Sequence, residues 1–162
     1  MGRIVIIDTG YQTVSAVQDL LEVKLAASQA GYVKRVKIMQ SSKESVSDAE
    51  QLQVNLKRAA GSFTSGSNGG AATIVKGQSG DAAHGLSTTE RNNTTQAVAG
   101  TGTLETLEPG AFSVLAGEWE VTPTPELQWP IGPSEAAILS IDEAPGTALT
   151  LRAIMNIELT HG

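Results

Sequence analysis

The chain has 162 residues, a formal net charge of −6 and no cysteine. This length suits one domain with its own core, and the lack of cysteine excludes disulfides and thiolate metal sites. No stretch approaches the roughly eighteen consecutive apolar residues that a membrane span requires. The start, "MGRIVIIDTG", lacks the apolar region and cleavage site of a signal peptide. These features predict a single domain, 1–162, that is made in the cytoplasm and has no membrane partner.

The charge is unevenly distributed along the chain. Residues 103–162 hold nine acidic side chains and a single basic one, Arg152. Such a segment repels phosphate backbones, which argues against direct nucleic-acid binding. It is either a solvated acidic face or a surface that meets a basic one on a neighbouring copy or a partner.

In chain order, the first predicted element is a strand in the β-branched run "GRIVIID", so residues 1–12 are predicted as an N-terminal strand or arm. The next segment, "TVSAVQDLLEVKLAAS", fits both a helical stripe and a strand, and its period alone does not decide. The short strands around it favour a strand. "VKRVKIMQ" and "QLQVNLKR" then alternate apolar and polar residues, as half-buried strands do.

The composition changes between residues 59 and 102. This stretch holds nine of the 17 glycines, four charged side chains and few residues that can fill a core. Long loops in compact domains are usually functional or disordered, and the low charge argues against a disordered linker. Residues 61–100 are therefore predicted as one long, ordered polar loop that contacts another surface.

The clearest strands lie near the C-terminus. "SVLAGEWEV" supplies one or two strands, and "WEVTPTPELQWPIGP", with four of the six prolines, is predicted as an extended, irregular connection at a sheet edge. "AAILSID" and "ALTLRAIMNIELT" are predicted as two strands that form a hairpin through a turn at Pro145-Gly146. Together these elements predict an all-β fold.

The sequence offers little material for catalysis. Gly61 and Gly66 have the spacing of a phosphate-binding loop, but Ser67 stands where that loop requires a lysine. His84 lies in "GDAAHG", no nucleophile elbow accompanies it, and with Asp81 it has too few neighbouring ligands for a metal. The sequence therefore predicts that the protein is not an enzyme and binds no cofactor or metal.

The two tryptophans, Trp119 and Trp129, allow two interpretations. Glu118 and Glu120 flank Trp119 on one strand face, where they cannot bracket a glycosidic bond, so they are predicted as exposed glutamates beside an inward tryptophan. Two tryptophans can form a sugar-stacking platform. More commonly they pack against a core or fill a pocket between subunits.

Several glycine-, proline- and asparagine-rich motifs follow one another along the chain: "EQLQVNLKR", "TSGSNGG", "GDAAHG", "NNTT", "EWEVTPTPE" and "LSIDEAPGTALTLRAIMNIEL". Their order resembles a family of small virion proteins of tailed bacteriophages, the capsid decoration (cement) and related head-surface proteins, over roughly residues 13–159. The resemblance implies a jelly-roll-like β-sandwich with a long Gly-rich loop and an extended N-terminal segment. It also implies a structural protein of the capsid surface that clusters as a homotrimer.

The implied function is to bind the outside of a phage head at junctions between major capsid protein subunits and to stabilise the shell. The N-terminal strand and the 61–100 loop are the candidate contacts, because loops on a rigid scaffold carry recognition and glycine lets the backbone approach another surface. The predicted interaction residues are Arg3, Ile4, Ile6, Ser65, Asn68, Arg91, Asn92, Asn93, Trp119 and Trp129. The alternatives are a carbohydrate-binding host-attachment module, which two exposed tryptophans would favour, and a head–tail or tail structural protein.

Overall fold

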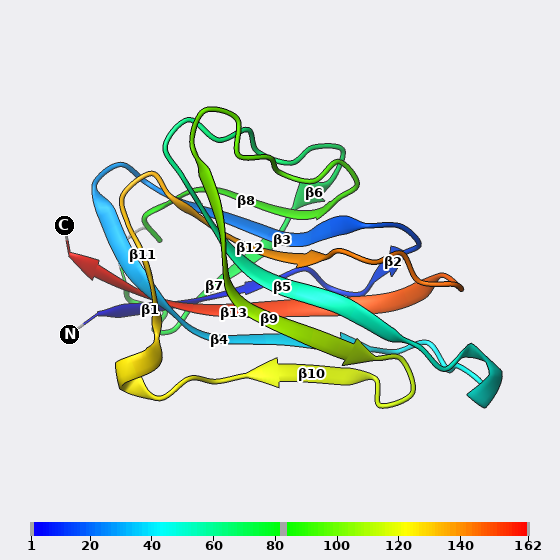
Figure 1. The fold of residues 1–162 in the computed structure, drawn as a ribbon. Helices are drawn as coiled ribbons and strands as arrows, with labels where there is room; N and C mark the ends of the chain where they lie inside the picture. The colour runs from blue at the N-terminus through cyan, green and yellow to red at the C-terminus, as the bar shows by residue number, and fades with distance from the viewer. Residues whose placement is uncertain (1, 82–83, 162) are drawn as a thin grey trace.

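A computed structural model describes residues 2–81 and 84–161 and shows two antiparallel sheets packed against each other (Figure 1). The strands are β1 (Arg3–Asp8), β2 (Gln12–Val14), β3 (Gln18–Leu25), β4 (Gln29–Gln40), β5 (Gln51–Ala60), β6 (Gly70–Ala71), β7 (Thr73–Lys76), β8 (Leu86–Asn93), β9 (Thr103–Ser113), β10 (Glu118–Val121), β11 (Trp129–Ile131), β12 (Ala136–Ile141) and β13 (Leu149–His161). Two short 3-10 turns, η1 (Val46–Asp48) and η2 (Pro125–Leu127), complete the described elements. No helix in this described part is long and apolar enough to cross a membrane.

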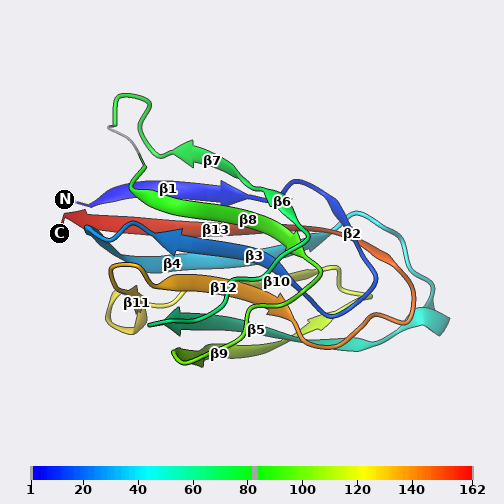
Figure 2. The same ribbon diagram turned by 90° about the horizontal axis from the view of Figure 1, so that it is seen from above.

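Each sheet contains strands from distant parts of the chain. Sheet A has the order β10-β4-β13-β1-β7, with β11 also paired to β4 and β2 also paired to β13. Sheet B has the order β6-β8-β3-β12-β5-β9. The start of β1 and the end of β13 lie side by side at one end of the sandwich (Figures 1 and 2), where Arg3 is paired with Leu159.

The chain crosses repeatedly between the two sheets. Among the strands of four or more residues, β1, β4, β7, β10 and β13 belong to sheet A, and β3, β5, β8, β9 and β12 belong to sheet B. The predicted all-β sandwich is confirmed. The finer jelly-roll type stays a prediction.

The core lies between the sheets and is almost entirely aliphatic. The alternation predicted from "ALTLRAIMNIELT" is confirmed, because every second side chain of β13 from Leu149 to Leu159 is buried. Val36 and Ile38 of β4 and Leu52 of β5 enter the same core. Period-two burial is what places one face of each of these strands inside the sandwich.

The ambiguous segment before residue 28 forms strands, β2 and β3. All of β3 except Lys24 is buried, so both of its faces are covered. A strand with two buried faces lacks the apolar–polar alternation of a half-buried strand. This explains why its sequence also fits the stripe of a helix.

The predicted hairpin between "AAILSID" and "ALTLRAIMNIELT" is wrong. β12 lies in sheet B between β3 and β5, whereas β13 lies in sheet A between β1 and β4. The turn at Pro145 therefore connects the two sheets instead of two neighbouring strands. β12 is buried on both faces, so each of its neighbours in the sheet comes from elsewhere in the chain.

The segment predicted as one loop, 61–100, contains three strands. It lies between β5 and β9, which pair with each other from Ala60 and Thr103 onward. Within it, β7 pairs with β1 in sheet A and β8 pairs with β3 in sheet B, so the segment extends both sheets at the same edge. Because β7 covers its outer edge, β1 is an internal strand of sheet A and not a free arm.

The remaining parts of this segment, residues 61–69 and 94–102, form a unit that we call the overlay. They run antiparallel to each other, through isolated bridges between Thr64 and Val98 and between Ser67 and Thr95. The overlay lies above sheet B in Figure 1. Phe63 and Ala97 of the overlay pack against Ala136 and Ile138 of β12.

Candidate functional site

The two outer faces of the sandwich differ in what covers them. On sheet B, the overlay buries the outward side chains of β3 and β12, including Asp19 and Glu22. The outer face of sheet A carries no such layer from the described chain. A surface for an external partner is therefore available on sheet A and on the top of the overlay itself.

The outer face of sheet A is made of matching positions on neighbouring strands. Ile6 of β1 is paired with Val75 of β7 and with Asn156 of β13. Nearer the start of β1, Ile4 is paired with Glu158 of β13, and Glu158 is in turn paired with Tyr32 of β4. We call this surface, with Ile154 at its centre, the A face.

Exposed apolar side chains lie on the A face. Ile4 is 45% exposed, Val75 49% and Tyr32 40%, while Ile6 and Ile154 are half-buried. Large apolar side chains that gather on one face of a soluble protein mark a binding surface more often than scattered ones do. Val75, Tyr32 and Ile154 were not among the predicted residues. A signal for Ile154 was present, because it is the one apolar residue on the otherwise polar side of β13.

The charges of the A face are paired within the chain. Lys34 Nζ lies 2.6 Å from Glu158 Oε2, and Arg35 Nε lies 2.7 Å from Glu120 Oε1. Hydrogen bonds from these cations hold the pKa of each glutamate below its usual range. The A face therefore brings few uncompensated charges to a partner.

Further ion pairs continue this pattern. Lys37 Nζ lies 2.6 Å from Glu118 Oε1, and Arg152 forms a two-pronged ion pair with Asp8. The hydrogen bond from Arg152 lowers the pKa of Asp8. Arg152 also lies over the ring of the exposed Tyr11, 5.6 Å from its centroid. The expected exposure of Glu118 and Glu120 beside an inward Trp119 is confirmed.

The structure brings the predicted residues of β1 onto or beside the A face. Ile4 and Ile6 point outward, and Arg3 at the start of β1 donates from Nη2 to Gln29 Oε1 at 3.4 Å. Trp119 and Trp129 are far from β1 in this sheet, because they pair with β4, and β13 separates β4 from β1.

The tryptophans do not form an exposed pair. Trp129 is buried in the main core, and Trp119 is half-buried and packs against it. Gly110 of β9 provides the space for the Trp119 ring, since a Cβ atom there would lie 2.6 Å from Nε1. Both side chains therefore pack against the core on the side of the sandwich near β9 and β10. This agrees with the packing interpretation and not with an exposed sugar-stacking platform.

Most of the predicted residues from 65 to 93 contact their own chain. Arg91 Nη1 donates to the Thr9 carbonyl at 2.6 Å, and Asn92 Nδ2 donates to the Thr13 carbonyl at 3.1 Å. Asn93 is buried and cannot meet a partner in this conformation. Ser65 and Asn68 are exposed on the overlay, where Asn68 Nδ2 donates to Thr95 Oγ1.

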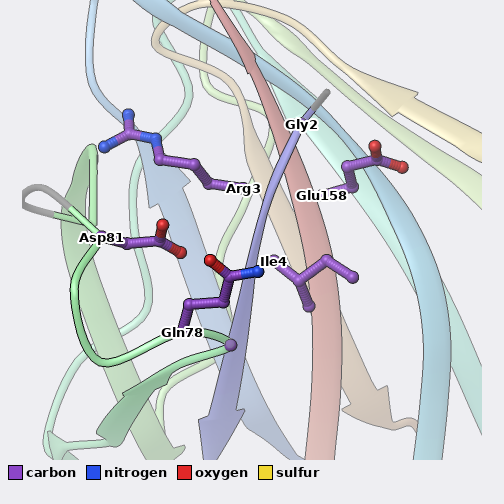
Figure 3. A pocket seen from close by; sticks show the side chains of 7 residues that line it. Gly2, Arg3, Ile4, Gln78, Asp81 and Glu158 are labelled. Carbon is purple, nitrogen blue, oxygen red and sulfur yellow. The ribbon is translucent and has the colours of Figure 1, made fainter.

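A shallow cavity of about 380 Å³ lies at the start of β1, beside the A face (Figure 3). Arg3, Gln78 and Asp81 lie on one side of β1, with Ile4 and Glu158 on the other. Asp81 and Glu158 bring negative charge to the rim and Arg3 brings positive charge. This mixed lining contains no nucleophile–base pair, so we read the cavity as a border of the A face.

The candidate catalytic and metal residues do not converge. His84 Nδ1 accepts a hydrogen bond from the backbone N–H of Leu86 at 3.1 Å, which occupies that nitrogen. Across residues 2–81 and 84–161, no group of three or more histidine, aspartate or glutamate side chains is arranged to hold a metal ion.

The strongest electrostatic perturbation lies beneath the overlay. Burial raises the pKa of Asp19 to about 7, and the nearby carboxylates of Glu22 and Asp142 add to the shift, while a hydrogen bond from the Ala97 backbone opposes it. Asp142 is also partly buried, but hydrogen bonds from Lys57, Gln96 and Asn55 outweigh the burial and lower its pKa. In the sequence, Asp19 is an exception to the strand pattern of this segment, but that exception did not indicate a buried carboxyl group.

Comparisons with known proteins give this chain no relatives. No protein-family model, curated protein or experimentally determined structure matches it significantly. The fold and the A face therefore carry the functional argument, together with the motif resemblance.

Proposed function

We propose that the protein is a capsid decoration protein of a tailed bacteriophage. It binds the outside of the head at junctions between major capsid protein subunits, with the A face as its contact surface. The observation that carries this proposal is the difference between the two outer faces: the chain covers sheet B with its own overlay and leaves the A face open, with exposed apolar side chains.

The chemistry of the A face suits adhesion to a protein lattice. Burying Ile4, Val75 and Tyr32 against a partner removes apolar surface from water, which favours association. Lys34 and Arg35 of the A face already pair with Glu158 and Glu120, so docking does not leave these charges unpaired in the interface. These properties support binding to a folded protein surface.

Stabilisation of the shell follows from selective binding. A protein that binds the assembled lattice and not the separate subunits stabilises the lattice by mass action. If three copies act together as a homotrimer, several modest contacts combine into strong attachment. No catalytic step is required, and the acidic C-terminal segment argues against contact with the packaged DNA.

The direct experiment uses phage particles. The copies of this chain per purified particle are counted, and particles that lack it are heated while DNA release is recorded. We expect hundreds of copies, and a lower DNA-release temperature without the protein that is restored when purified protein is added back. A few copies per particle, or an unchanged release temperature, would contradict the proposal.

Two matched valines identify the contact surface. Val75 on the A face is 49% exposed and Val98 on the overlay is 54% exposed, on opposite sides of the sandwich. We expect Val75→Lys to weaken binding to bare particles by at least tenfold, because a charge replaces apolar contact area, and Val98→Lys to bind as wild type does. If Val98→Lys weakened binding and Val75→Lys did not, the contact surface would be the overlay, which is part of the predicted 61–100 loop.

The alternative functions gain less support. A carbohydrate-binding module would need a stacking platform, and the tryptophan pair is packed in and against the core. A head–tail or tail structural protein would show a low copy number in the particle count above. The particle count therefore separates the tail protein from the decoration protein, and the packing of Trp119 and Trp129 argues against the carbohydrate-binding module.

A further inference from the structure

Each of the two segments of the overlay is held to sheet B by one buried carboxylate. Glu22 Oε2 accepts a hydrogen bond from the Gly66 backbone N–H at 2.9 Å, and Asp19 Oδ2 accepts one from the Ala97 backbone N–H at 2.7 Å. Gly66 belongs to the first segment of the overlay, residues 61–69, and Ala97 belongs to the second, residues 94–102. Both carboxylates lie on β3 and are almost completely buried.

The carboxylates receive little compensation for this burial. The overlay, residues 61–69 and 94–102, contains no charged side chain. Within residues 2–81 and 84–161, Glu22 Oε1 finds no hydrogen-bond partner, and neither does Oδ1 of the buried Asn93 next to it. A charged group removed from water without full hydrogen bonding is costly to the folded state.

Several charged groups face Asp19 from the elements around it. Glu22 lies on the same strand, and Asp142 follows β12. On β8, Glu90 shares the Asn93 amide with Glu22, so that side also contributes a carboxylate. Among the described residues, the cation that acts on Asp19 is Lys57 of β5, which already pairs with Asp142 at 2.8 Å.

The overlay also covers an apolar patch. Phe63 and Ala97 of the overlay pack on Ala59, Ala136 and Ile138 of sheet B. Phe63 additionally lies 5.1 Å from Lys24 Nζ, ring centroid to nitrogen. Two opposing contributions therefore act on the overlay: apolar packing closes it, and the buried acidic groups favour opening.

We propose that the overlay is a proton-controlled cover, which stays closed on sheet B while the Asp19 carboxyl group is protonated and loosens when that proton is lost. Loosening lets water reach Asp19 and Glu22 and uncovers the apolar patch around Ile138. The two parts of the overlay join β5 to β6 and β8 to β9, and they lie outside the paired residues of β5 and β9, so lifting them does not require breaking that pairing.

The direction of the pH dependence follows from proton linkage. In the closed state burial holds the pKa of Asp19 at about 7, and in an open, hydrated state it returns toward its ordinary value of 3.8. Between these two values opening releases a proton, so the opening constant rises about tenfold per pH unit. Above about pH 7 both states are ionised and the constant levels off.

Hydrogen exchange on the full chain tests the cover. The protection of amides in residues 61–69 and 94–102, corrected for the intrinsic pH dependence of exchange, is measured at pH 5 and pH 7 in wild type and in Asp19→Asn. We expect wild-type protection to fall on the order of 100-fold between these values. In Asp19→Asn, whose side-chain oxygen can still accept the Ala97 hydrogen bond, we expect no such fall.

Two controls make the result decisive. Asp48→Asn removes a carboxylate of the η1 turn, far from the overlay, and should behave as wild type. Amides of β13 report unfolding of the whole sandwich and should stay better protected than those of the overlay at both pH values.

Three results would overturn the proposal: a wild-type change below threefold, the same pH dependence in Asp19→Asn, or overlay amides that exchange only at the rate of β13. If Asp19→Asn does not fold, the wild-type comparison of the overlay with β13 still decides.

Discussion

Between about pH 4 and pH 7, the Asp19 carboxyl group is protonated in the folded protein and ionised in the unfolded chain. Its pKa is raised to about 7 by burial, against 3.8 for the free side chain. A group with a raised pKa contributes its full stability below the lower value and loses it as pH rises through the higher one. The single carboxyl group therefore lowers the stability of the fold between about pH 4 and pH 7.

We expect Asp19→Asn to remove this loss. The difference in the free energy of unfolding between variant and wild type should grow from pH 4 to pH 7 and reach at most roughly 4 kcal/mol, the linkage value for this shift. Urea denaturation at a series of pH values measures it. A difference that is constant over this range would show that Asp19 is ionised in both states.

Carboxylates with lowered pKa values have the opposite effect on the pH dependence of stability, because they stabilise the fold as pH rises, and they do so at lower pH. Arg152 lowers the pKa of Asp8, so this ion pair stabilises the fold above about pH 4, and its contribution is lost as pH falls further. We expect Asp8→Asn to cost about 1 kcal/mol at pH 6 and little at pH 2, because a half-exposed pair contributes modestly. Thermal denaturation at both pH values checks this, and an equal cost at both would contradict it.

Gly110 is required by a neighbouring side chain. A Cβ atom at this position would lie 2.6 Å from Nε1 of Trp119, whose ring is packed against the core. We expect Gly110→Ala to destabilise the fold by about 1–3 kcal/mol through overpacking. Gly80→Ala, where a Cβ meets no atom within 4 Å, is the matched control and should change stability by less than about 0.5 kcal/mol.

At the scale of elements, β12 connects the two hydrophobic clusters. Leu139 faces the main core between the sheets, and Ile138 faces the small cluster beneath the overlay. Both side chains are fully buried, so truncating either should cost about 2–5 kcal/mol. Their effects should differ in location, because the two faces of one strand support different layers.

We therefore expect Ile138→Ala to reduce amide protection in the overlay more than in β13, and Leu139→Ala to reduce both alike. Hydrogen exchange on the two variants measures this difference. If both variants loosened the overlay and β13 equally, the overlay would be part of the same cooperative unit as the sandwich.

At the scale of the whole molecule, the proposed function requires two different surfaces. In that proposal the A face meets the capsid, and another surface joins the copies of the homotrimer. Edge strand β9 carries Glu105, Glu108 and Pro109, residue types that discourage unlimited strand-to-strand association. A closed ring of few copies agrees with such an edge better than an open chain does.

Light scattering on the purified protein tests the trimer. We expect three times the chain mass of 16.8 kDa, and the same mass for Val75→Lys, because the A face is assigned to the capsid. A stable dimer would contradict the trimer. A Val75→Lys protein that dissociates into single chains would place the A face between copies.

The alternating strands and the class of fold could be predicted from the sequence alone. The alternation in "ALTLRAIMNIELT" and in "QLQVNLKR" shows directly which side chains face a core, because the side-chain period of a strand is a local property of the backbone. The prolines around Pro125 and Pro130 likewise predicted an extended, irregular segment at a sheet edge, and in the structure this segment lies at the edge formed by β4. In these segments, local physics and the final fold agree.

The tertiary structure alone decided which strands are neighbours and what the glycine-rich segment covers. β12 joins sheet B and β13 joins sheet A because each finds its partners far away in the chain, which no turn signal at Pro145 encodes. Arg91 and Asn93 are polar in sequence but bind their own chain, because Arg91 reaches the Thr9 carbonyl after β1 and Asn93 reaches the buried Glu22 carboxylate of β3. Whether a polar side chain faces water or a buried carboxylate depends on the surface packed against it, and distant residues supply that surface.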